Sequence, residues 1–332
     1  MESLLNALDT FKERKVIVVG DILLDKSVIG TAKERMNPER VGVPLISVKK
    51  VEYRLGGAAN VARNVASLGA SCYLFGQIGK DYHGEKIKEL CAAEGIKTFL
   101  IYPGRQTIVK ERLFVDGDYS ARIDFGEENL GFLDYQKELD LEIGLSKEID
   151  SCNLILFSDY NKGVFKGGLA RRIIQEIKDN KRKILTLVDP KPANIGNFWG
   201  CDILRPNRKE AEEIAGIKND NENNLRDIAL KLTEKVNSKY LAITCGGEGA
   251  FAYDREKNRS EFVPTKRVTL ADVIGAGDTF AAALGLGFSS DLLDFGNSVK
   301  LANYASAVVV GKMGTSVTTD DELREAIKQE EG

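Results

Sequence analysis

The chain has 332 residues, and its 47 basic and 50 acidic side chains give a formal net charge of −3. This balance offers no electrostatic basis for binding nucleic acid or an anionic membrane, and we expect neither as a partner. No apolar run is long enough to span a membrane and the start has no signal-peptide pattern, so we expect a cytoplasmic protein. Five scattered cysteines and one histidine indicate free thiols and exclude a site built from several histidines.

Short apolar runs alternate along the chain with segments of helical periodicity. We interpret six runs as buried strands: 15–20, 72–76, 154–157, 184–189, 202–206 and 241–246. The segments between them place apolar residues at helical spacing beneath a charged outer face. This order predicts an α/β fold with a doubly wound, mostly parallel sheet flanked by helices. No linker or internal repeat divides the sequence, so we expect one domain over residues 1–332.

Two segments, residues 41–55 and 107–125, alternate polar and apolar residues instead. The second contains Asp116-Gly117, a strong signal for a hairpin turn. These segments predict a small β-sheet lid over a ligand site at the carboxyl ends of the main strands. The exposed edges of such a lid favour a homodimer, because an unpaired strand edge invites pairing.

Polar and glycine-rich positions follow several of these strands. In "GDILLDK" (20–26), Asp25 suits a sugar, since a carboxylate accepts hydrogen bonds from neighbouring hydroxyls; it could equally cap a turn. In "RLGGAANVARNVASLGA" (54–70), Gly56 and Gly57 end the lid strand and a helix begins with small residues. Asn60 then lies in the first helical turn, within reach of a ligand at the helix N-terminus; a glycine turn before a close-packed alanine helix, with no ligand, explains the same pattern.

The pair Asn207 and Glu210 has two interpretations. Their spacing is that of a helix capping box, which needs no ligand. The same oxygens also suit a magnesium-bound phosphate reached through water. A later loop with Thr244, Gly246 and Gly249 could lie against a nucleotide or be an ordinary glycine turn.

The stretch "ADVIGAGDTFAAALGLG" (271–287) combines small residues with one carboxylate. The sequence contains no P-loop motif. On its own the stretch could be an ordinary glycine turn before a buried helix. Alternatively, the backbone amides of Gly275, Ala276 and Gly277 can converge on an anion at the start of that helix. Asp278 would then take the proton of an attacking hydroxyl, an arrangement that phosphoryl transfer requires.

Five stretches occur in the order found in one family: "GDILLDK", "GGAANVARNVASLGA", "RPNRKEAEE", "ADVIGAGDTFAAA" and "ANYASAVVVGKMGTS". Together they resemble the ribokinase (PfkB) family of ATP-dependent carbohydrate kinases. The resemblance implies a ribokinase-like fold with a β-lid, ATP as co-substrate and Mg²⁺ as cofactor. It assigns the catalytic base to Asp278 and the anion hole to Gly275, Ala276 and Gly277. It also implies sugar contacts from Asp25, Gly56, Gly57 and Asn60; magnesium and phosphate contacts from Asn207 and Glu210; nucleotide contacts from Thr244, Gly246, Gly249 and Asn303; and a monovalent cation such as K⁺ at Asp272.

Within this family, several stretches are similar to the kinase domain of heptose 7-phosphate kinases. They include "ERLFVDGDYSARIDF", "LFSDYNKGVF" and "VDPK". This likeness implies D-glycero-β-D-manno-heptose 7-phosphate as acceptor, phosphorylated at its anomeric C1 hydroxyl for lipopolysaccharide and ADP-heptose precursor synthesis. A sugar phosphate needs cations, and candidates are Lys110, Arg112, Arg122 and Lys191, with Asp159 as a second carboxylate in the sugar pocket. The three lid cations could also simply form a solvated strand face.

Two alternatives stay open. The first is a kinase of the same family acting on another sugar, sugar phosphate or nucleoside. The second is a catalytically silent sugar- or nucleotide-binding regulator, against which the intact Asp278, Asn207 and Glu210 argue. With a single histidine, these residues carry no H-x-G-H motif, so we expect no nucleotidyltransferase activity from them.

Overall fold

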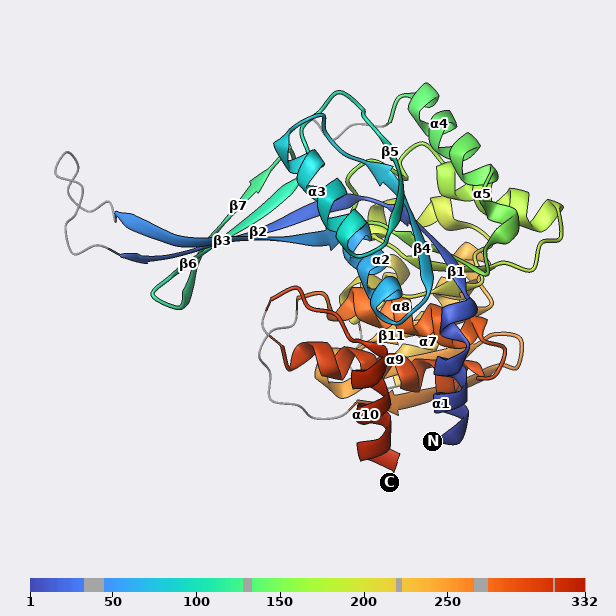
Figure 1. The fold of residues 1–332 in the computed structure, drawn as a ribbon. Coiled ribbons are helices and arrows are strands. Elements are labelled where there is room, and N and C mark those ends of the chain that lie inside the picture. The colour runs from blue at the N-terminus through green and yellow to red at the C-terminus, as the bar shows by residue number, and fades with distance from the viewer. Residues whose placement is uncertain (33–44, 128–132, 219–222, 266–273, 313, 332) are drawn as a thin grey trace.

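The structure is a computed structural model that describes residues 1–32, 45–127, 133–218, 223–265, 274–312 and 314–331. Its centre is a nine-stranded sheet in the order β13-β12-β11-β10-β9-β8-β1-β4-β5 (Figure 1). The strands from β5 to β11 pair in parallel, and β12 and β13 are antiparallel at one edge. The strands are β1 (Lys15–Gly20), β4 (Ser71–Gln77), β5 (Lys97–Ile101), β8 (Leu154–Ser158), β9 (Leu185–Asp189), β10 (Ile203–Leu204), β11 (Tyr240–Thr244), β12 (Gly249–Asp254) and β13 (Arg259–Pro264).

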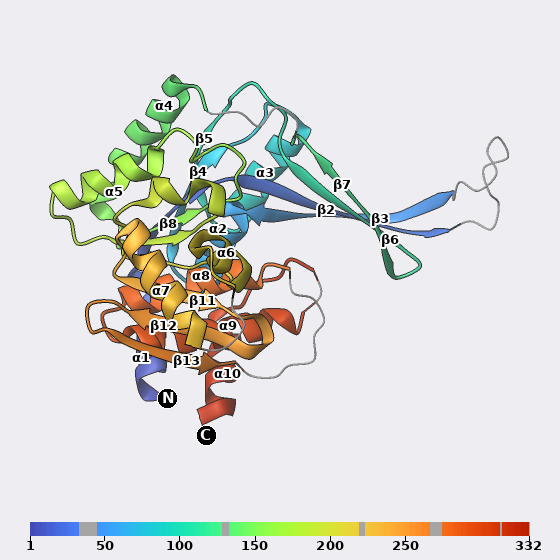
Figure 2. The same ribbon diagram turned by 180° about the vertical axis from the view of Figure 1, so that it is seen from behind.

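Helices cover both faces of this sheet because alternate strand residues point to opposite sides. Val16 and Val18 of β1 pack into one hydrophobic cluster, and Ile17 and Val19 pack into a second. The first cluster includes residues of α1 (Glu2–Asp9), α2 (Ala58–Ser67), α3 (Tyr82–Ala93), α8 (Ala276–Ser289), α9 (Phe295–Val310) and α10 (Asp320–Glu331). The second includes residues of α4 (Tyr135–Ser146), α5 (Leu169–Asp179), α6 (Arg208–Ala215) and α7 (Asn223–Val236). Figures 1 and 2 show the two groups from opposite sides, and the predicted doubly wound α/β fold is confirmed.

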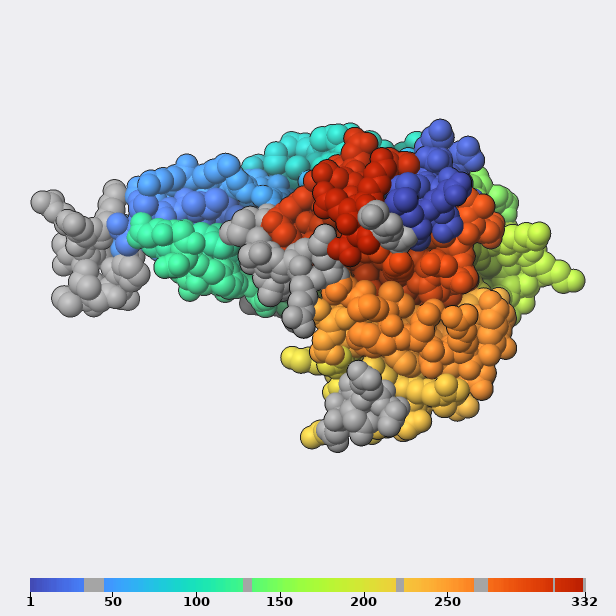
Figure 3. All heavy atoms as spheres, turned by 90° about the horizontal axis from the view of Figure 1, so that it is seen from below, coloured from blue at the N-terminus to red at the C-terminus, as the bar shows by residue number. Residues whose placement is uncertain are grey.

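A second sheet of four strands, in the order β3-β2-β6-β7, projects from the body of the molecule (Figures 1 and 3). Its strands are β2 (Ile22–Ala32), β3 (Ile46–Gly57), β6 (Val109–Val115) and β7 (Asp118–Phe125). The turn between β6 and β7 has positive φ at Asp116 (53°) and Gly117 (94°), as the Asp-Gly signal predicted. This sheet is the predicted lid.

The lid differs from the prediction in one respect. Strand β2 was not expected: it follows β1 after the single residue Asp21, so the lid grows directly out of a central strand. The sequence hides this change because "ILL" at 22–24 is as apolar as the core strand before it. The first predicted lid segment begins at residue 41, and residues 41–44 lie outside the described part of the chain.

The predicted strands of the main sheet differ from the observed ones in number and length. The predicted strand 202–206 shortens to Ile203–Leu204, since Pro206 has no amide to donate to a ladder. Strands β5, β12 and β13 were not predicted.

All five cysteines are free and buried. Among the described residues, no helix combines the length and apolarity that crossing a membrane requires. Helices α1 and α10 lie side by side, and Arg324 forms a 2.8 Å ion pair with Asp9 (Figure 3).

Candidate active site

Asp278 lies at the N-terminus of α8, where Gly275 is the N-cap and Ala276 is the first helical residue. Its side chain is buried, and both carboxylate oxygens accept hydrogen bonds. Asn60 Nδ2 donates to Oδ2 at 2.6 Å, and the Tyr160 hydroxyl donates to Oδ1 at 2.8 Å. The first amides of a helix have no carbonyl partner within the helix, so an anion placed here meets free donors and the positive end of the dipole. The site therefore places a fixed carboxylate at the amide end of a helix.

Close packing explains the glycines at this junction. Gly57 ends β3 with φ of 57°, and a Cβ there would lie 2.4 Å from the Asp21 carbonyl oxygen. Gly275 has φ of 84°, and a Cβ there would lie 3.0 Å from Asn60 Nδ2. Both positions require glycine, because β3, α2 and α8 meet with no space for a side chain.

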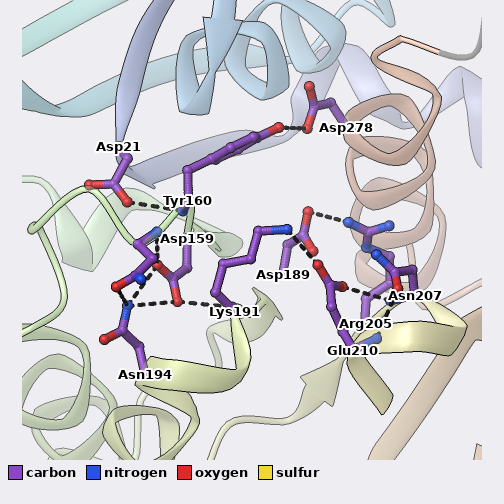
Figure 4. A network of polar contacts seen from close by, with 11 residues as sticks. Asp21, Asp159, Tyr160, Asp189, Lys191, Asn194, Arg205, Asn207, Glu210 and Asp278 are labelled. Carbon is purple, nitrogen blue, oxygen red and sulfur yellow. Dashed lines mark hydrogen bonds and ion pairs between the residues drawn. The ribbon is translucent and has the colours of Figure 1, made fainter. Parts of the chain in front are cut away.

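Two buried aspartates hold the loop that carries Tyr160. The Asp21 carboxylate accepts the backbone amides of Tyr160, Lys162 and Val164. The Asp159 carboxylate accepts the amide of Lys191 at 2.9 Å and the Asn194 side chain at 3.0 Å (Figure 4). Asp159, predicted as a sugar-pocket carboxylate, is 2% exposed, and its contacts are internal to the protein. In the structure it fixes the Lys191 loop.

A chain of ion pairs runs from this loop to α6. Lys191 Nζ pairs with Glu210 and lies 5.7 Å from the centroid of the Tyr160 ring. Asp189, at the end of β9, pairs with the buried Arg205 (Figure 4). Arg205 lies directly beneath the start of α8, since a Cβ on Gly277 would lie 3.1 Å from its Nη1. Lys191 was predicted as a cation for a sugar phosphate, but its ammonium is already engaged by Glu210.

Asn207 and Glu210 form the capping box that their spacing predicted. Asn207 Oδ1 accepts the Glu210 amide at 3.0 Å, and Glu210 Oε2 accepts the Asn207 amide at 2.9 Å. Each of these oxygens keeps a second lone pair, and Asn207 is exposed. The capping role and a water-mediated contact with a metal are therefore compatible.

Asp25 lies where the lid meets the body of the molecule. Arg112 from β6 donates to its Oδ1 at 2.6 Å, and Thr315 donates to its Oδ2 at 3.1 Å. Gly56 is pressed against the same carboxylate, since a Cβ there would lie 2.9 Å from Oδ2. Arg122, also predicted as a cation for a sugar phosphate, lies opposite Arg112 in the strand register, pairs with Asp124 and has a side chain that is 49% exposed. Of these predicted lid cations, Arg112 is neutralised by Asp25 and Arg122 faces solvent.

Lys110 has a different environment, at the base of the lid. Burial and the neighbouring Lys162 ammonium lower the pKa of Lys110. Lys162 forms a 2.7 Å ion pair with Glu127, and Arg105 donates to the Lys162 carbonyl oxygen at 2.7 Å. Burial also lowers the pKa of Arg105. We call Arg105, Lys110 and Lys162 the lid-base cluster; within the described residues, no carboxylate forms an ion pair with Lys110.

The predicted nucleotide residues lie around β11, β12 and α9. Gly246 is exposed with φ of 60°, and a Cβ there would meet no atom within 4 Å. Gly249 is buried at the start of β12, where a Cβ would lie 2.2 Å from the Val263 carbonyl oxygen. Thr244 forms an isolated bridge with Asn207, which links this loop to the capping box. Asn303 is buried and donates to the Val263 carbonyl oxygen at 2.8 Å, so it ties α9 to β13.

Asp272, predicted near a monovalent cation, lies outside the described residues. Within the described ranges, no group of three histidine, cysteine, aspartate or glutamate side chains is placed to hold a metal ion.

Burial dominates the electrostatics of the site. It raises the pKa of Asp278 to about 6, helped by the Asp189 charge and opposed by Asn60, Tyr160 and Arg205. It also raises the pKa of Asp159 to about 6, together with the Asp21 charge. A carboxylate with a pKa close to neutrality accepts a proton more readily than an ordinary aspartate, while it remains largely ionised at pH 7.

Several residues at this centre were not predicted from sequence: Tyr160, Asp189, Arg205, Arg105, Lys162 and Thr315. Arg205 could have been noticed as an arginine directly after a buried strand. Tyr160 gave no signal, because an aromatic residue near a strand end is common.

This architecture defines a carbohydrate kinase of ribokinase-like fold. Residues 13–322 match the pfkB family carbohydrate kinase. Among curated proteins, the chain is 34% identical over 319 residues to the "Bifunctional protein HldE" of Campylobacter curvus (strain 525.92), covering 96% of this chain and 66% of that protein. It is 35% identical over 318 residues to the HldE of Haemophilus influenzae (strain PittEE), covering 96% and 64%. The chain thus spans about two thirds of the length of these relatives.

Solved structures share the fold at low identity. Phosphofructokinase-2 from Escherichia coli in complex with potassium has a TM-score of 0.77 at 19% identity, over 95% of this chain and 98% of that chain. A putative ribokinase from Agrobacterium tumefaciens has a TM-score of 0.74 at 17% identity, over 95% and 98%. The chain belongs to the pfkB family of carbohydrate kinases and is a phosphotransferase acting on a sugar hydroxyl.

Proposed function

We propose that this kinase transfers the γ-phosphoryl group of ATP to the C1 hydroxyl of D-glycero-β-D-manno-heptose 7-phosphate. The product would be the 1,7-bisphosphate, a precursor in lipopolysaccharide and ADP-heptose synthesis. The observation that carries the phosphoryl-transfer chemistry is the buried Asp278 at the N-terminus of α8, held by Asn60 and Tyr160. The similarity to the HldE proteins and the lid-base cluster support the choice of acceptor.

In the proposed reaction, Asp278 removes the proton of the acceptor hydroxyl. The acceptor oxygen forms a bond to the γ-phosphorus while the bond to the β–γ bridging oxygen breaks, and ADP leaves. The amides of Gly275, Ala276 and Gly277 stabilise negative charge on the moving group, and the Arg205–Asp189 ion pair lies beneath Gly277. Because these donors are preorganised, little reorganisation is needed during transfer.

Mg²⁺ fits the nucleotide side of this site as a water-bound ion. Asn207 and Glu210 would hold its waters with the lone pairs that the capping box leaves free. When bound, the ion would neutralise charge on the β- and γ-phosphates. The surroundings of the nucleotide would be formed by Thr244, Gly246, Gly249 and Asn303. Gly246 is exposed and could contact the nucleotide, whereas Gly249 and Asn303 are buried and would support the loop.

The lid-base cluster supports a phosphorylated acceptor. Arg105, Lys110 and Lys162 lie close together at the lid base, and burial and the Lys162 charge lower the pKa of Lys110, so that its charge would gain from a compensating anion. A phosphate dianion would supply that compensation, since charge-assisted contacts strengthen where water is excluded. Asp25, Gly56, Gly57 and Asn60, between this cluster and Asp278, would contact the sugar.

Our proposal also covers the extent of the kinase unit, its compartment, a monovalent cation and the oligomeric state. We propose that residues 1–332 work as one kinase unit in the cytoplasm, with K⁺ at Asp272. We also propose a homodimer that covers the lid face opposite Asp25. The strand register places Val51 and Ile123 on that face, and they are 42% and 45% exposed.

A coupled assay of ADP release tests the acceptor. It compares heptose 7-phosphate with unphosphorylated heptose, fructose 6-phosphate, ribose and nucleosides, and phosphorus NMR locates the new phosphate. We expect heptose 7-phosphate to be preferred over unphosphorylated heptose by roughly 10–100-fold in kcat/KM, the value of one or two charge-assisted contacts. A preference for a free sugar or a nucleoside would refute the acceptor, and consumption of no sugar would favour a silent regulator.

Replacing the lysines of the lid-base cluster tests whether this cluster binds the phosphate of the acceptor. Lys110→Met and Lys162→Met should raise KM for the phosphorylated acceptor and leave KM for ATP nearly unchanged. The matched control is Lys26→Met, because Lys26 is also a partly buried lid lysine but pairs with Glu111 on the other face. Equal effects of the three variants would show that the lid-base cluster does not bind phosphate.

A further inference from the structure

Tyr160 occupies a position that the proposed chemistry does not yet use. Its hydroxyl donates to Asp278 Oδ1 at 2.8 Å, on the oxygen that Asn60 leaves unoccupied. Each carboxylate oxygen accepts two hydrogen bonds, so Oδ1 keeps one lone pair for the acceptor hydroxyl. Asn60 and Tyr160 therefore fix the orientation of the carboxylate by one hydrogen bond to each oxygen. This orientation determines from which direction Oδ1 can accept a proton.

Tyr160 acts as a donor in this contact. Burial and the Asp278 and Asp189 charges hold the pKa of Tyr160 well above its usual range, so the phenol keeps its proton. Within the described residues, the main charged or titratable neighbours of Asp278 are Tyr160 from the loop after β8, Asp189 at the end of β9 and Arg205 after β10, beside the neutral Asn60 of α2. Asp189 and Arg205 pair with each other, which leaves Tyr160 as a direct donor to the carboxylate.

The tyrosine is held in place independently of any ligand. Its amide donates to the buried Asp21 at 2.9 Å, and the preceding Asp159 is bound by Lys191 and Asn194 (Figure 4). The Lys191 ammonium lies 5.7 Å from the ring centroid, within the range of a cation–π contact, and also pairs with Glu210 of the capping box. One side chain thus touches both the proposed base and the lysine that contacts the nucleotide-side helix.

We propose that Tyr160 is a positioning residue for Asp278: its hydroxyl orients the carboxylate and favours the ionised form, and its ring connects the base to the Lys191–Glu210 pair. This inference rests on the proposed role of Asp278 as the base, and it does not depend on which sugar is the acceptor. A purely structural tyrosine would support the fold equally well at every pH, whereas a donor to the base must affect the ionisation of that base.

The test is the dependence of kcat on pH for Tyr160→Phe, using the best acceptor found for the wild-type enzyme. We expect kcat to fall roughly 10–100-fold, as for loss of a hydrogen bond to a charged group, with KM for the acceptor changed less than about twofold. The acidic limb should move to higher pH, because removing a donor destabilises the carboxylate form. The control is Tyr240→Phe, a half-buried tyrosine that packs against Phe288 and Phe295 away from the site.

Incorporation of 3-fluorotyrosine at position 160 should shift the acidic limb in the opposite direction. It tests the positioning role of Tyr160 even if Tyr160→Phe folds poorly. Its more acidic phenol donates more strongly, so the acidic limb should move to lower pH. An acidic limb that stays in place in the variants that fold would overturn the proposal, even if kcat falls. Failure of the base assignment is seen separately, since Asp278→Asn would then retain turnover whatever Tyr160 does.

Discussion

Asn60 and Asp278, the third residues of α2 and α8, are joined by a 2.6 Å hydrogen bond from Asn60 Nδ2 to Asp278 Oδ2. Each helix follows a glycine with positive φ, Gly57 before α2 and Gly275 before α8. The positive ends of two helices therefore meet at one carboxylate, which favours its ionised form against the cost of burial.

Replacement of Asp278 by asparagine preserves shape and removes the base. Asp278→Asn should lower kcat by roughly 10²–10⁴-fold, the usual contribution of a general base, with ATP affinity nearly unchanged. Steady-state kinetics and nucleotide titration by calorimetry measure the two quantities. The control Asp140→Asn, on the surface of α4, should behave like the wild type. Turnover near the wild-type rate in Asp278→Asn would refute the assignment of the base.

The raised pKa of Asp278 predicts an acidic limb in the activity profile. The carboxylate must be ionised to accept a proton, so activity should fall as pH drops through about 6. An ordinary aspartate would keep its activity well below pH 5. Profiles of kcat/KM between pH 4.5 and 8 test this, over the range in which circular dichroism shows the protein folded. A profile that stays flat down to the unfolding pH contradicts the prediction.

The same burial predicts a stability cost at neutral pH. The pKa of Asp278 is higher in the folded state than its ordinary value of 3.8, so the folded state binds the proton more tightly. Its favourable contribution is complete below pH 3.8 and is lost as pH rises through about 6. Asp278→Asn should accordingly stabilise the protein by about 1–3 kcal/mol at pH 8 and by less at pH 5. Urea unfolding at the two pH values measures the difference, and an equal effect at both would contradict it.

Two capping boxes allow the roles of Glu210 to be separated. Glu322 also caps its helix, by accepting the Thr319 amide at 2.9 Å, and also pairs with a lysine, Lys312. Glu210→Gln and Glu322→Gln should therefore lower Tm by similar, small amounts. Glu210→Gln should in addition reduce kcat and shift the magnesium dependence to higher concentration. If the two variants have equal activity, Glu210 is a cap and nothing more.

The junction of β3 and α2 should not tolerate a side chain. Gly57→Ala combines a positive φ with a Cβ 2.4 Å from the Asp21 carbonyl oxygen. Gly69 also has positive φ, at 93°, but a Cβ there would meet no atom within 4 Å. We expect Gly69→Ala to cost about 1 kcal/mol of stability and Gly57→Ala more than about 2 kcal/mol. Denaturant unfolding compares the two, and equal losses would show that space at Gly57 is not limiting.

Local sequence patterns account for much of this fold. Continuous apolar runs identified the parallel core, and the Asp116-Gly117 turn identified the lid hairpin, because both are set by neighbours in the chain. Strand β2 escaped prediction because an apolar run does not reveal which of two sheets it joins. Strands β12 and β13 at one end of the main sheet were also missed, and β13 is mostly exposed, without a continuous apolar run.

In the candidate site, too, local sequence patterns predicted some features and missed others. The capping box of Asn207 and Glu210 is encoded by a spacing of three residues and was predicted as one of two alternatives. The contacts of Asp278 with Asn60 and Tyr160 span 218 and 118 residues, so no local pattern contains them. Asp159 was assigned to the sugar pocket because sequence shows a carboxylate at a strand end but does not show where its oxygens point.

The division between two sheets has an evolutionary consequence. Asp25, Lys110 and Arg112 are carried by lid strands, whereas Asp278 and the neighbouring amides that we propose to bind the anion are carried by a helix packed on the main sheet. Under the proposed mechanism, substitutions in the lid would change which sugar is accepted without disturbing the packing that positions Asp278. Natural selection could then vary the acceptor while the proposed phosphoryl-transfer centre is inherited unchanged.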